Sequence, residues 1–278
     1  MLALSRRALA RPEEQVGNPV WETREEMESE LGGWDREPDE TLFVEEENGG
    51  VIGFGGVEVA SGWEHADLFG PLVAPAFRGR KIGSRLLEAS IEIGQRSGAS
   101  RIVGSLGTRN VGGRMLLERH GFRPREGASA IFRLHPSEHR PAARPESMEV
   151  RRGRPEDLEV VLALYRECFP TGRFPESVWH EGLERGTVYV AEDEGGVVGL
   201  VDIDPSDRWL YHLGVTESER SRGVGAFLLS SALQEYWTAH PGETLGLSVG
   251  ADNLPAIRLY RRQGFMPWLV LQYFELTL

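Results

Sequence analysis

The chain has 278 residues, 40% of them hydrophobic and 27% charged, with a formal net charge of −12. This composition is typical of a globular protein and excludes a disordered chain, and the acidic balance argues against a nucleic-acid partner. Every apolar run is shorter than the roughly 18 residues of a membrane-spanning helix, so we expect no membrane association. Cys168 is the single cysteine, which excludes intrachain disulfides and fits a reducing, cytoplasmic location.

The first half of the chain predicts a succession of strands, although residues 1–20 contain no convincing first strand. From Thr41 onward, alternating residues predict strands over 42–46, 51–59 and 67–73, the first two joined through Gly49-Gly50. Two further phrases follow these strands: Arg78-Gly79-Arg80-Lys81-Ile82-Gly83, and a stretch that runs from Asn110 to Gly121-Phe122.

Residues 135–147 have the composition of a linker. They contain three prolines and show no apolar periodicity. His135 and His139 are four residues apart, but Pro136 opposes a helix there and no third ligand is apparent. A solvated linker is therefore favoured over a metal site, and we predict no metal.

The second half predicts a complete set of elements. Pro155-Glu156-Asp157 starts a helix, and a further helix surrounds Trp179 to Leu183. A strand is expected before them over 148–152. The remaining predicted strands and helices are, in chain order, strands 187–192, 197–204 and 209–215, helix 224–237, strand 244–249, helix 255–263 and strand 269–276.

The two halves repeat one another. Arg220-Ser221-Arg222-Gly223-Val224-Gly225 lies 220 − 78 = 142 residues after its counterpart, and the phrase from Asn253 to Gly264-Phe265 lies 253 − 110 = 143 residues after its own. We therefore expect two α/β domains, each a mostly antiparallel central sheet flanked by helices. Their predicted bounds are 1–134 for a first copy, 135–147 for the linker and 148–278 for a second copy.

The glycine phrase has the chemistry of a phosphate site. A strand followed by R-x-x-G-x-G and a helix leaves backbone N–H groups pointing outward at the positive end of the helix dipole. Gly223 and Gly225 permit close approach of a diphosphate, and Arg220 and Arg222 add charge-assisted contacts. The downstream phrase places Tyr260 on a helix that begins near Pro255. Taken alone, a tyrosine at this position is equally well explained as a residue of the hydrophobic core.

With R-x-x-G-x-G after a strand and N-x-x-A-x-x-L-Y-x-x-x-G-F downstream, the second copy resembles the GNAT superfamily of acetyl-coenzyme-A-dependent N-acetyltransferases. The resemblance covers nearly all of residues 148–278 and most of 41–134, and its tandem form is also similar to mycothiol synthase-like enzymes. It implies that Tyr260 faces the sulfur of acetyl-CoA. The residues that it implies for cofactor binding are Leu213, Gly214, Val215, Arg220, Ser221, Arg222, Gly223, Val224, Gly225, Ala226 and Asn253.

The first copy departs from the family pattern. Lys81 replaces the first glycine of the phrase, Gly113 the alanine and Leu117 the tyrosine. Because leucine cannot donate a proton, we expect a degenerate first domain and an active site in the second.

The resemblance implies direct attack of a primary amine on the thioester. Backbone N–H groups near Leu213 to Val215 would hold the oxyanion, and Tyr260 would protonate the departing thiolate. The general base is a water chain or one of four side chains: Asp202, Asp204, His212 or Glu217. Histidine is the residue type that most readily exchanges a proton near neutral pH, so we assign His212 together with Tyr260 as catalytic.

The alternative function is a non-catalytic acyl-CoA binding or sensing protein in which Tyr260 merely packs. The partner is a small-molecule or peptide amine, and neither its identity nor the oligomeric state follows from the sequence.

Overall fold

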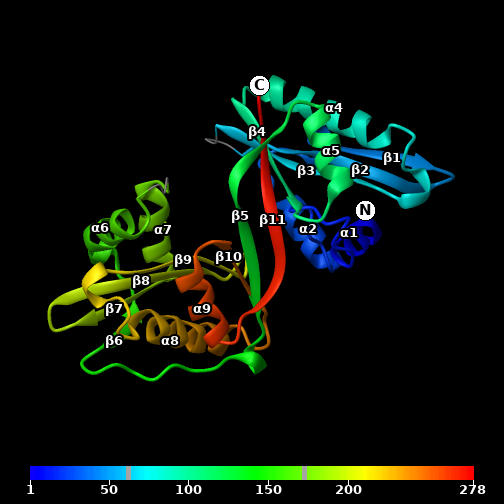
Figure 1. Cartoon of the computed structure of the whole chain (residues 1–278). Helices are drawn as coiled ribbons and strands as arrows, with labels where there is room; N and C mark the ends of the chain where they lie inside the picture. Colours follow the sequence, from blue (N-terminus) through cyan, green and yellow to red (C-terminus); the bar gives the residue numbers. More distant parts are fainter. Residues whose placement is uncertain (61–63, 171–173) are drawn as a thin grey trace. The chain divides into compact units, whose positions relative to one another are not determined.

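The computed structural model describes residues 1–60, 64–170 and 174–278. The chain divides into two compact units (Figure 1). Unit 1 comprises Met1–Ser129 and Leu269–Leu278, and unit 2 comprises Ala130–Trp268. Each unit is a mixed α/β structure, which confirms the predicted fold class.

Unit 1 contains a sheet in the order β1-β2-β3-β4-β11, in which only β3 and β4 run parallel. Helix α4 lies on one face of it, and α1 and α2 lie on the other (Figure 1). The elements are α1 (Leu2–Leu9), α2 (Arg24–Gly32), α3 (Pro38–Thr41), β1 (Leu42–Glu47), β2 (Gly50–Glu58), β3 (His65–Val73), α4 (Ile82–Ser97), β4 (Arg101–Gly107), α5 (Val111–Arg119) and the later part of β11 (Met266–Thr277).

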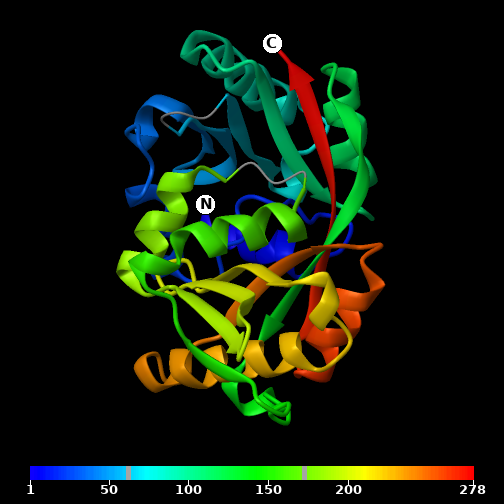
Figure 2. The same cartoon turned by 90° about the vertical axis from the view of Figure 1, so that its left-hand side faces the viewer.

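Unit 2 contains a sheet in the order β5-β10-β9-β8-β7-β6, in which β6 to β9 are antiparallel and β9 runs parallel to β10. Helices α6 and α7 cover one face and α8 the other (Figure 2). The elements are β5 (Arg123–Leu134), β6 (Glu149–Arg152), α6 (Leu158–Cys168), α7 (Glu176–Arg185), β7 (Val188–Asp193), β8 (Gly196–Asp204), β9 (Trp209–Val215), α8 (Val224–Ala239), β10 (Leu245–Gly250) and α9 (Leu254–Arg262).

The compact units do not coincide with the proposed bounds of the two copies. The predicted strand 269–276 joins unit 1, where Leu271–Thr277 pairs antiparallel with Arg101–Gly107. Conversely, Phe132 and Leu134 of β5 belong to the hydrophobic core that surrounds α8 in unit 2. Strands β5 and β11 have 12 residues each, about twice the usual strand length, so each has residues to contribute to both units.

The start of the first copy differs from that of the second, as the sequence indicated. Residues 1–41 contain helices α1, α2 and α3 where the second copy begins with strand β6, and Trp21 and Trp34 of this region enter the core of unit 1. The ring of Trp21 stacks on Phe54 at 5.8 Å and lies tilted against Phe69 at 5.5 Å. Aromatic packing therefore covers the sheet of unit 1.

The linker is fastened to unit 2. Arg140 donates its backbone N–H to the carbonyl of Gln263 (3.0 Å), and Ala142 donates to Ser230 Oγ (3.1 Å). His139 Nε2 lies 3.3 Å from Gln263 Oε1, and His135 Nδ1 lies 2.7 Å from Ser137 Oγ. Both histidines therefore contact protein partners.

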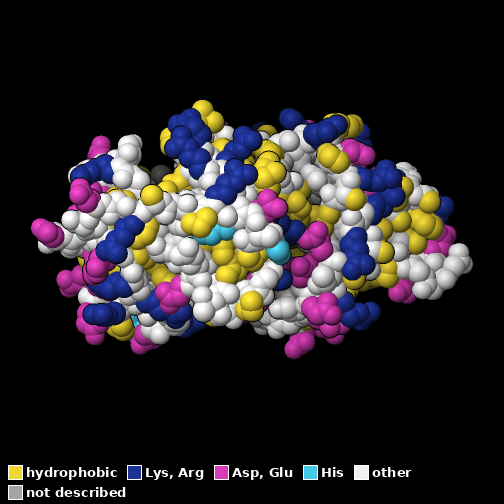
Figure 3. All heavy atoms as spheres, turned by 90° about the horizontal axis from the view of Figure 1, so that it is seen from below, with side chains coloured by type: hydrophobic (Ala, Val, Ile, Leu, Met, Phe, Trp, Pro, Cys, Tyr) yellow, Lys and Arg dark blue, Asp and Glu magenta, His cyan; other side chains and the backbone are white. Residues whose placement is uncertain are grey.

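The surface carries charges of both signs. On the face that Figure 3 draws, acidic and basic side chains are interspersed. Among the described residues, no three His, Cys, Asp or Glu side chains are grouped so that they could hold a metal ion. None of the described helices combines the length and apolar character needed to cross a membrane.

Candidate functional site

The candidate site of unit 2 begins where two parallel strands part. Strands β9 and β10 pair only at Gly246 with Trp209 and at Leu247 with Leu210. Beyond these pairs β9 continues to Val215 without a partner on that side among the described residues. The predicted cofactor residues Leu213, Gly214 and Val215 therefore lie on an unpaired stretch of strand edge, where a ligand could pair with the backbone. The carbonyl of Val215 is already bound by Arg220.

The glycine loop of the second copy (residues 220–225) lies directly after β9 and a 3₁₀ turn (Glu217–Glu219). Ser221 and Gly223 have φ values of +64° and +88°, in the left-handed region. Gly223 is the N-cap of α8 and no side chain caps this helix, so the N–H groups of Val224, Gly225 and Ala226 have no protein acceptor among the described residues. These donors and the helix dipole together suit an anion.

The glycine loop of the first copy (residues 78–83) has the same backbone form. Gly79 and Lys81 have φ values of +79° and +60°, at positions 142 residues before Ser221 and Gly223. Each loop thus has two left-handed positions, and only one of them is glycine. It is the first position in the first copy (Gly79) and the second position in the second copy (Gly223). Lys81 does not alter the loop conformation, although it is the residue by which the sequence departs from the family pattern.

Gly225 serves helix packing. A Cβ atom at this position would lie 3.3 Å from Val215 Cγ2 and 3.4 Å from Leu259 Cδ1. The glycine thus lets the first turn of α8 approach β9 and α9 closely. Its backbone N–H is one of the three donors at the start of α8 that have no acceptor among the described residues.

The arginines of the loop are partly committed to protein partners. Arg220 donates Nε–H to the carbonyl of Val215 at 2.9 Å, as Arg78 does to Val73 at 3.0 Å in the first copy. Arg222 donates Nη1–H to both carboxylate oxygens of Glu219 at 2.8 and 2.9 Å. Arg220 therefore fixes the end of the strand relative to the loop.

Asn253 is the N-cap of α9. Its Oδ1 accepts the N–H of Ala256 at 3.2 Å, which leaves its Nδ2 group without a partner among the described residues. The side chain is exposed. A helix cap thus presents an amide donor just after β10, one of the two strands that part.

Tyr260 lies on α9 within the hydrophobic core that surrounds α8, and is 7% exposed. Its ring meets Phe265 edge-on at 5.6 Å, and its hydroxyl has no hydrogen-bond partner among the described residues. Burial raises the pKa of Tyr260 above its usual value, so the phenol stays protonated at neutral pH. This side chain holds a proton and has no protein acceptor for it.

His212 lies on the opposite face of β9, toward α6 and α7. Its ring is 7% exposed and is surrounded by aromatic rings at centroid distances of 4.7 to 6.4 Å: Tyr165, Phe169, Phe174, Trp179 and Tyr211. Its Nδ1 is buried without a hydrogen bond, and Asp202 Oδ2 lies 3.5 Å away. The arrangement pairs an imidazole with a carboxylate in a largely apolar surrounding.

Two of the other base candidates, Asp202 and Asp204, have local partners for their carboxylates. Asp202 accepts a hydrogen bond from Thr187 Oγ1 at 3.1 Å, and Asp204 accepts the N–H of Ser206 at 2.8 Å. Glu217 donates its backbone N–H to Glu167 at 2.8 Å in the 3₁₀ turn. Of the four candidate side chains, those of His212 and Glu217 form no hydrogen bond with the residues that the structure describes, and of these two only His212 is buried.

Cys168 packs against the candidate edge strand. Its Sγ lies 3.5 Å from the carbonyl oxygen of Val215, and burial raises the pKa of the thiol. A protonated thiol is a poor nucleophile, which supports a packing role for Cys168.

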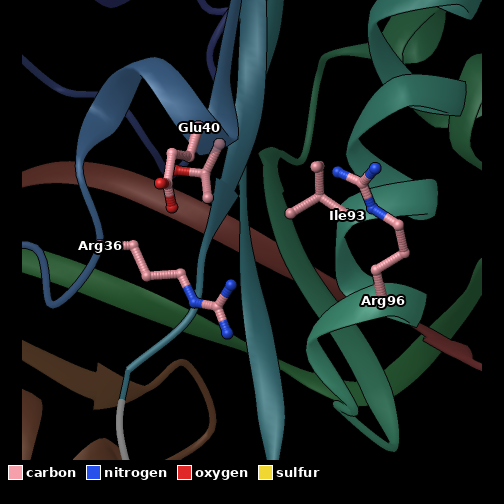
Figure 4. A pocket seen from close by; sticks show the side chains of 5 residues that line it. Arg36, Glu40, Ile93 and Arg96 are labelled. Carbon is pink, nitrogen blue, oxygen red and sulfur yellow. The ribbon is translucent and has the colours of Figure 1, made fainter.

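A hollow of about 280 Å³ in unit 1 lies apart from the sequence motifs. Figure 4 shows Arg36 and Glu40 on one side of it and Ile93 and Arg96, from α4, on the other. None of its lining residues belongs to a glycine loop or to an Asn-capped helix.

The family model described as the acetyltransferase (GNAT) family matches residues 7–122 and again 158–265. The chain belongs to this acetyltransferase family. The two matches confirm the tandem GNAT-like arrangement that the repeat predicted.

Individual relatives agree with this assignment. An N-alpha-acetyltransferase of Sulfurisphaera tokodaii is 26% identical over 48% of this chain and 89% of its own length. An uncharacterized N-acetyltransferase of Methanocaldococcus jannaschii is 30% identical over 46% of this chain and 85% of its own. Each of these relatives thus matches about half of the chain.

Solved structures show the same fold. A GCN5-related N-acetyltransferase from Sphaerobacter thermophilus superposes with a TM-score of 0.75 at 20% identity, covering 92% of this chain and 85% of its own. A tandem GNAT protein from the clavulanic acid biosynthesis pathway gives a TM-score of 0.63 at 16% identity over 85% and 82% of the two chains.

Two features of the site have no counterpart in the sequence analysis. Gly214 is required because a Cβ there would lie 2.9 Å from Cys168 Sγ, a contact between residues 46 positions apart. The second feature is the position of Glu14, which hydrogen-bonds Arg78 in the glycine loop of the first copy. Neither contact leaves a periodic or motif signal, because each depends on tertiary packing.

Proposed function

We propose that the protein is an acetyl-CoA-dependent N-acetyltransferase with its active site in unit 2. The observation that carries the proposal is the parting of β9 from β10 beside the uncapped N-terminus of α8. This arrangement offers extended backbone for an amide-containing arm and free N–H donors for a diphosphate.

The residues present fit coenzyme A. The N–H groups of Val224 to Ala226 would hold its diphosphate, and the exposed amide of Asn253 would donate to a carbonyl of its pantetheine arm. Arg220 keeps the loop in place by its bond to Val215. Acetyl-CoA would supply a thioester carbonyl for attack by the amine.

Two side chains on opposite faces of the sheet would divide the catalytic roles. His212, supported by Asp202, would accept the proton that the substrate ammonium must lose before its nitrogen can attack. Tyr260, in the core on the other face, would donate its proton to the thiolate that leaves when the carbon–sulfur bond breaks. A base and an acid on opposite faces of the sheet suit a direct transfer of the acetyl group. In such a transfer the amine approaches the thioester carbonyl from one side and the thiol leaves from the other.

The acceptor is a small-molecule or peptide amine. The aromatic rings around His212 and the carboxylates of Asp202, Asp204 and Asp207 would attract a cationic amine. The two archaeal relatives named N-alpha-acetyltransferase support including peptide N-termini in a substrate panel.

Replacing Tyr260 with Phe tests the proposal. We expect the rate constant for acetyl transfer to fall about 100- to 10,000-fold, with little change in the affinity for acetyl-CoA. Tyr236→Phe is the matched control, since Tyr236 lies in the same core but donates its hydroxyl to Glu243. Single-turnover measurements with a panel of amines would show the difference.

Two results would contradict the proposal. An unchanged single-turnover rate in Tyr260→Phe would remove the tyrosine from the reaction. Binding of acetyl-CoA without transfer to any amine of the panel would favour the non-catalytic sensor instead.

A further inference from the structure

In unit 1, a segment of the chain lies in the place that the cofactor arm would take. Strands β3 and β4 pair in parallel only over His65–Asp67 and Arg101–Val103. Beyond these pairs the structure describes no pairing of β3 with β4. Residues 12–18, which we call the insert segment, lie between them and bind both.

Backbone hydrogen bonds fix the insert segment on both sides. On the side of β4, Gly17 donates its N–H to the carbonyl of Ser105 (2.8 Å), and Gly107 donates to Gln15 (2.9 Å). On the side of β3, Gly70 donates its N–H to the carbonyl of Asn18 (2.8 Å). The segment thus uses the inner edges of both parted strands, as an extra strand would.

A carboxylate of the insert segment reaches the glycine loop. Glu14 accepts a hydrogen bond from Arg78 Nη2 at 2.8 Å, and two more from Arg7 at 3.1 Å each. Its side chain is only 7% exposed. Burial by itself would raise the pKa of Glu14, but the hydrogen bonds from the two arginines outweigh it and hold the pKa below its usual value. Glu14 is therefore a buried anion bound to the first arginine of the loop.

The two Asn caps show the difference between the copies. Asn110 caps α5 by accepting the N–H of Gly113 on its Oδ1, as Asn253 caps α9. Its Nδ2, which takes no part in the cap, donates to the carbonyl of Gln15 at 2.9 Å. Asn110 is 8% exposed, whereas Asn253 is exposed and its Nδ2 has no partner among the described residues. The insert segment thus satisfies in unit 1 the donor that stays available in unit 2.

We infer that the insert segment is a built-in substitute for coenzyme A in unit 1, and that it closes this cleft to the cofactor. Glu14 takes the place of an anionic group of coenzyme A near the glycine loop. Residues 15–18 take the place of the amide-containing arm of coenzyme A. The protein then binds one coenzyme A per chain, in unit 2. This inference rests on the proposed function in treating the parted strands of unit 2 as the cofactor cleft.

The fit leaves no room for a second occupant. A Cβ atom on Gly17 would lie 1.7 Å from Ser105 Oγ, and one on Gly107 would lie 2.7 Å from Gln15 Cβ. Coenzyme A could enter only if the insert segment left the cleft. Its departure would also disturb Val16, which is 4% exposed in the core of unit 1.

Hydrogen exchange with and without coenzyme A tests the inference on the full chain. In the free protein, we expect the amides of Gly17, Gly70 and Gly107 to exchange at least about 100-fold more slowly than in an unfolded chain. Saturating coenzyme A should leave their exchange unchanged, while peptides that contain Ser221 to Ala226 become protected. Calorimetric titration should give one site per chain.

The variant Glu14→Ala tests the anchoring by the carboxylate. We expect exchange at Gly17 and Gly107 to rise about tenfold or more, because Arg78 then loses its bond to the insert segment. The control is Glu13→Ala, since the neighbouring Glu13 has a side chain that is 58% exposed. Exchange in the control should match the unchanged protein.

Failure of the inference is distinguishable from failure of the proposed function. Rapid exchange at Gly17 and Gly107 in the free protein, a change there on adding coenzyme A, or two sites per chain would overturn the inference. Protected amides in unit 1 with no binding anywhere would instead overturn the proposed function, and would leave a closed cleft in unit 1.

Discussion

The left-handed residues of the two glycine loops give a quantitative prediction. Lys81 is the N-cap of α4 with φ +60°, at the position where the second copy has Gly223 with φ +88°. A left-handed conformation costs a residue with a Cβ about 1–2 kcal/mol. Glycine avoids this cost but loses about 0.5–1 kcal/mol more conformational entropy on folding. Lys81→Gly should therefore stabilise unit 1 by about 0.5–1 kcal/mol.

Lys81→Ala is the control that separates the backbone from the charge. Alanine removes the ammonium but keeps a Cβ, so it retains the conformational cost and should bring little stabilisation. Lys81 forms no ion pair with the residues that the structure describes, so loss of its charge should matter little. Denaturant-dependent hydrogen exchange of peptides from α4 would measure the free energy of unfolding of unit 1 in all three proteins.

The mirror change completes the test. Gly223→Ala would place a Cβ 3.8 Å from the nearest atom, Pro145 Cγ, so it introduces no clash. By the same balance of left-handed strain against the conformational entropy of glycine, its cost should be about 0.5–1 kcal/mol in unit 2. The reasoning is refuted if Lys81→Gly is no more stable than Lys81→Ala, or if Gly223→Ala unfolds at the same denaturant concentration as the unchanged protein.

Two further changes test the packing and electrostatics of the units. Burial and the nearby carboxylates raise the pKa of Glu58 from 4.5 to about 7, so the folded state binds its proton more tightly and loses stability as the pH rises from about 4.5 to 7. Glu58→Gln should therefore have almost no effect on the stability of unit 1 at pH 4.5. At pH 8 it should stabilise unit 1 by about 1 kcal/mol, after allowance for solvent screening. Equal effects in denaturant titrations at both pH values would exclude the raised pKa of Glu58 as the cause. Gly214→Ala should destabilise unit 2 by about 1–3 kcal/mol, because its Cβ would meet Cys168 Sγ at 2.9 Å. In thermal unfolding, adding Cys168→Ala should restore part of that loss, and purely additive effects would show that the sulfur is not the obstacle.

Local patterns in the sequence predict most of the secondary structure. The strand over 209–215 coincides with β9, and the helices and strands around it agree within a few residues. Alternation, glycine turns and helix caps act over short distances, so they leave periodic signals that can be read from the chain. The repeat spacing likewise revealed two copies, because both keep the same loop between strand and helix.

Long-range packing is what the sequence does not reveal. Nothing in the pattern of Leu269–Leu278 shows that these residues pair with β4 of unit 1, because alternation specifies a strand but not its neighbour. The insert segment is a similar case. Residues 12–18 have no strand-like alternation, and their place depends on contacts with Arg78 and Asn110, far along the chain.

The sequence predicts the backbone positions of the candidate site more completely than it predicts the roles of the individual residues. The sequence placed Ser221 to Ala226 in a turn and at a helix start, and the structure shows left-handed residues and free N–H donors there. The structure adds a packing reason for Gly225, whose missing side chain allows close contact with Val215 and Leu259. Its expected approach to a diphosphate stays a prediction. The roles of Tyr260 and His212 stay predictions.

A crystal structure of the protein with coenzyme A bound tests the central claim most directly. We expect one molecule per chain, with its diphosphate against the N–H groups of Val224 to Ala226 and its sulfur within hydrogen-bonding reach of the Tyr260 hydroxyl. An empty glycine loop in unit 2, or a sulfur remote from Tyr260, would contradict it.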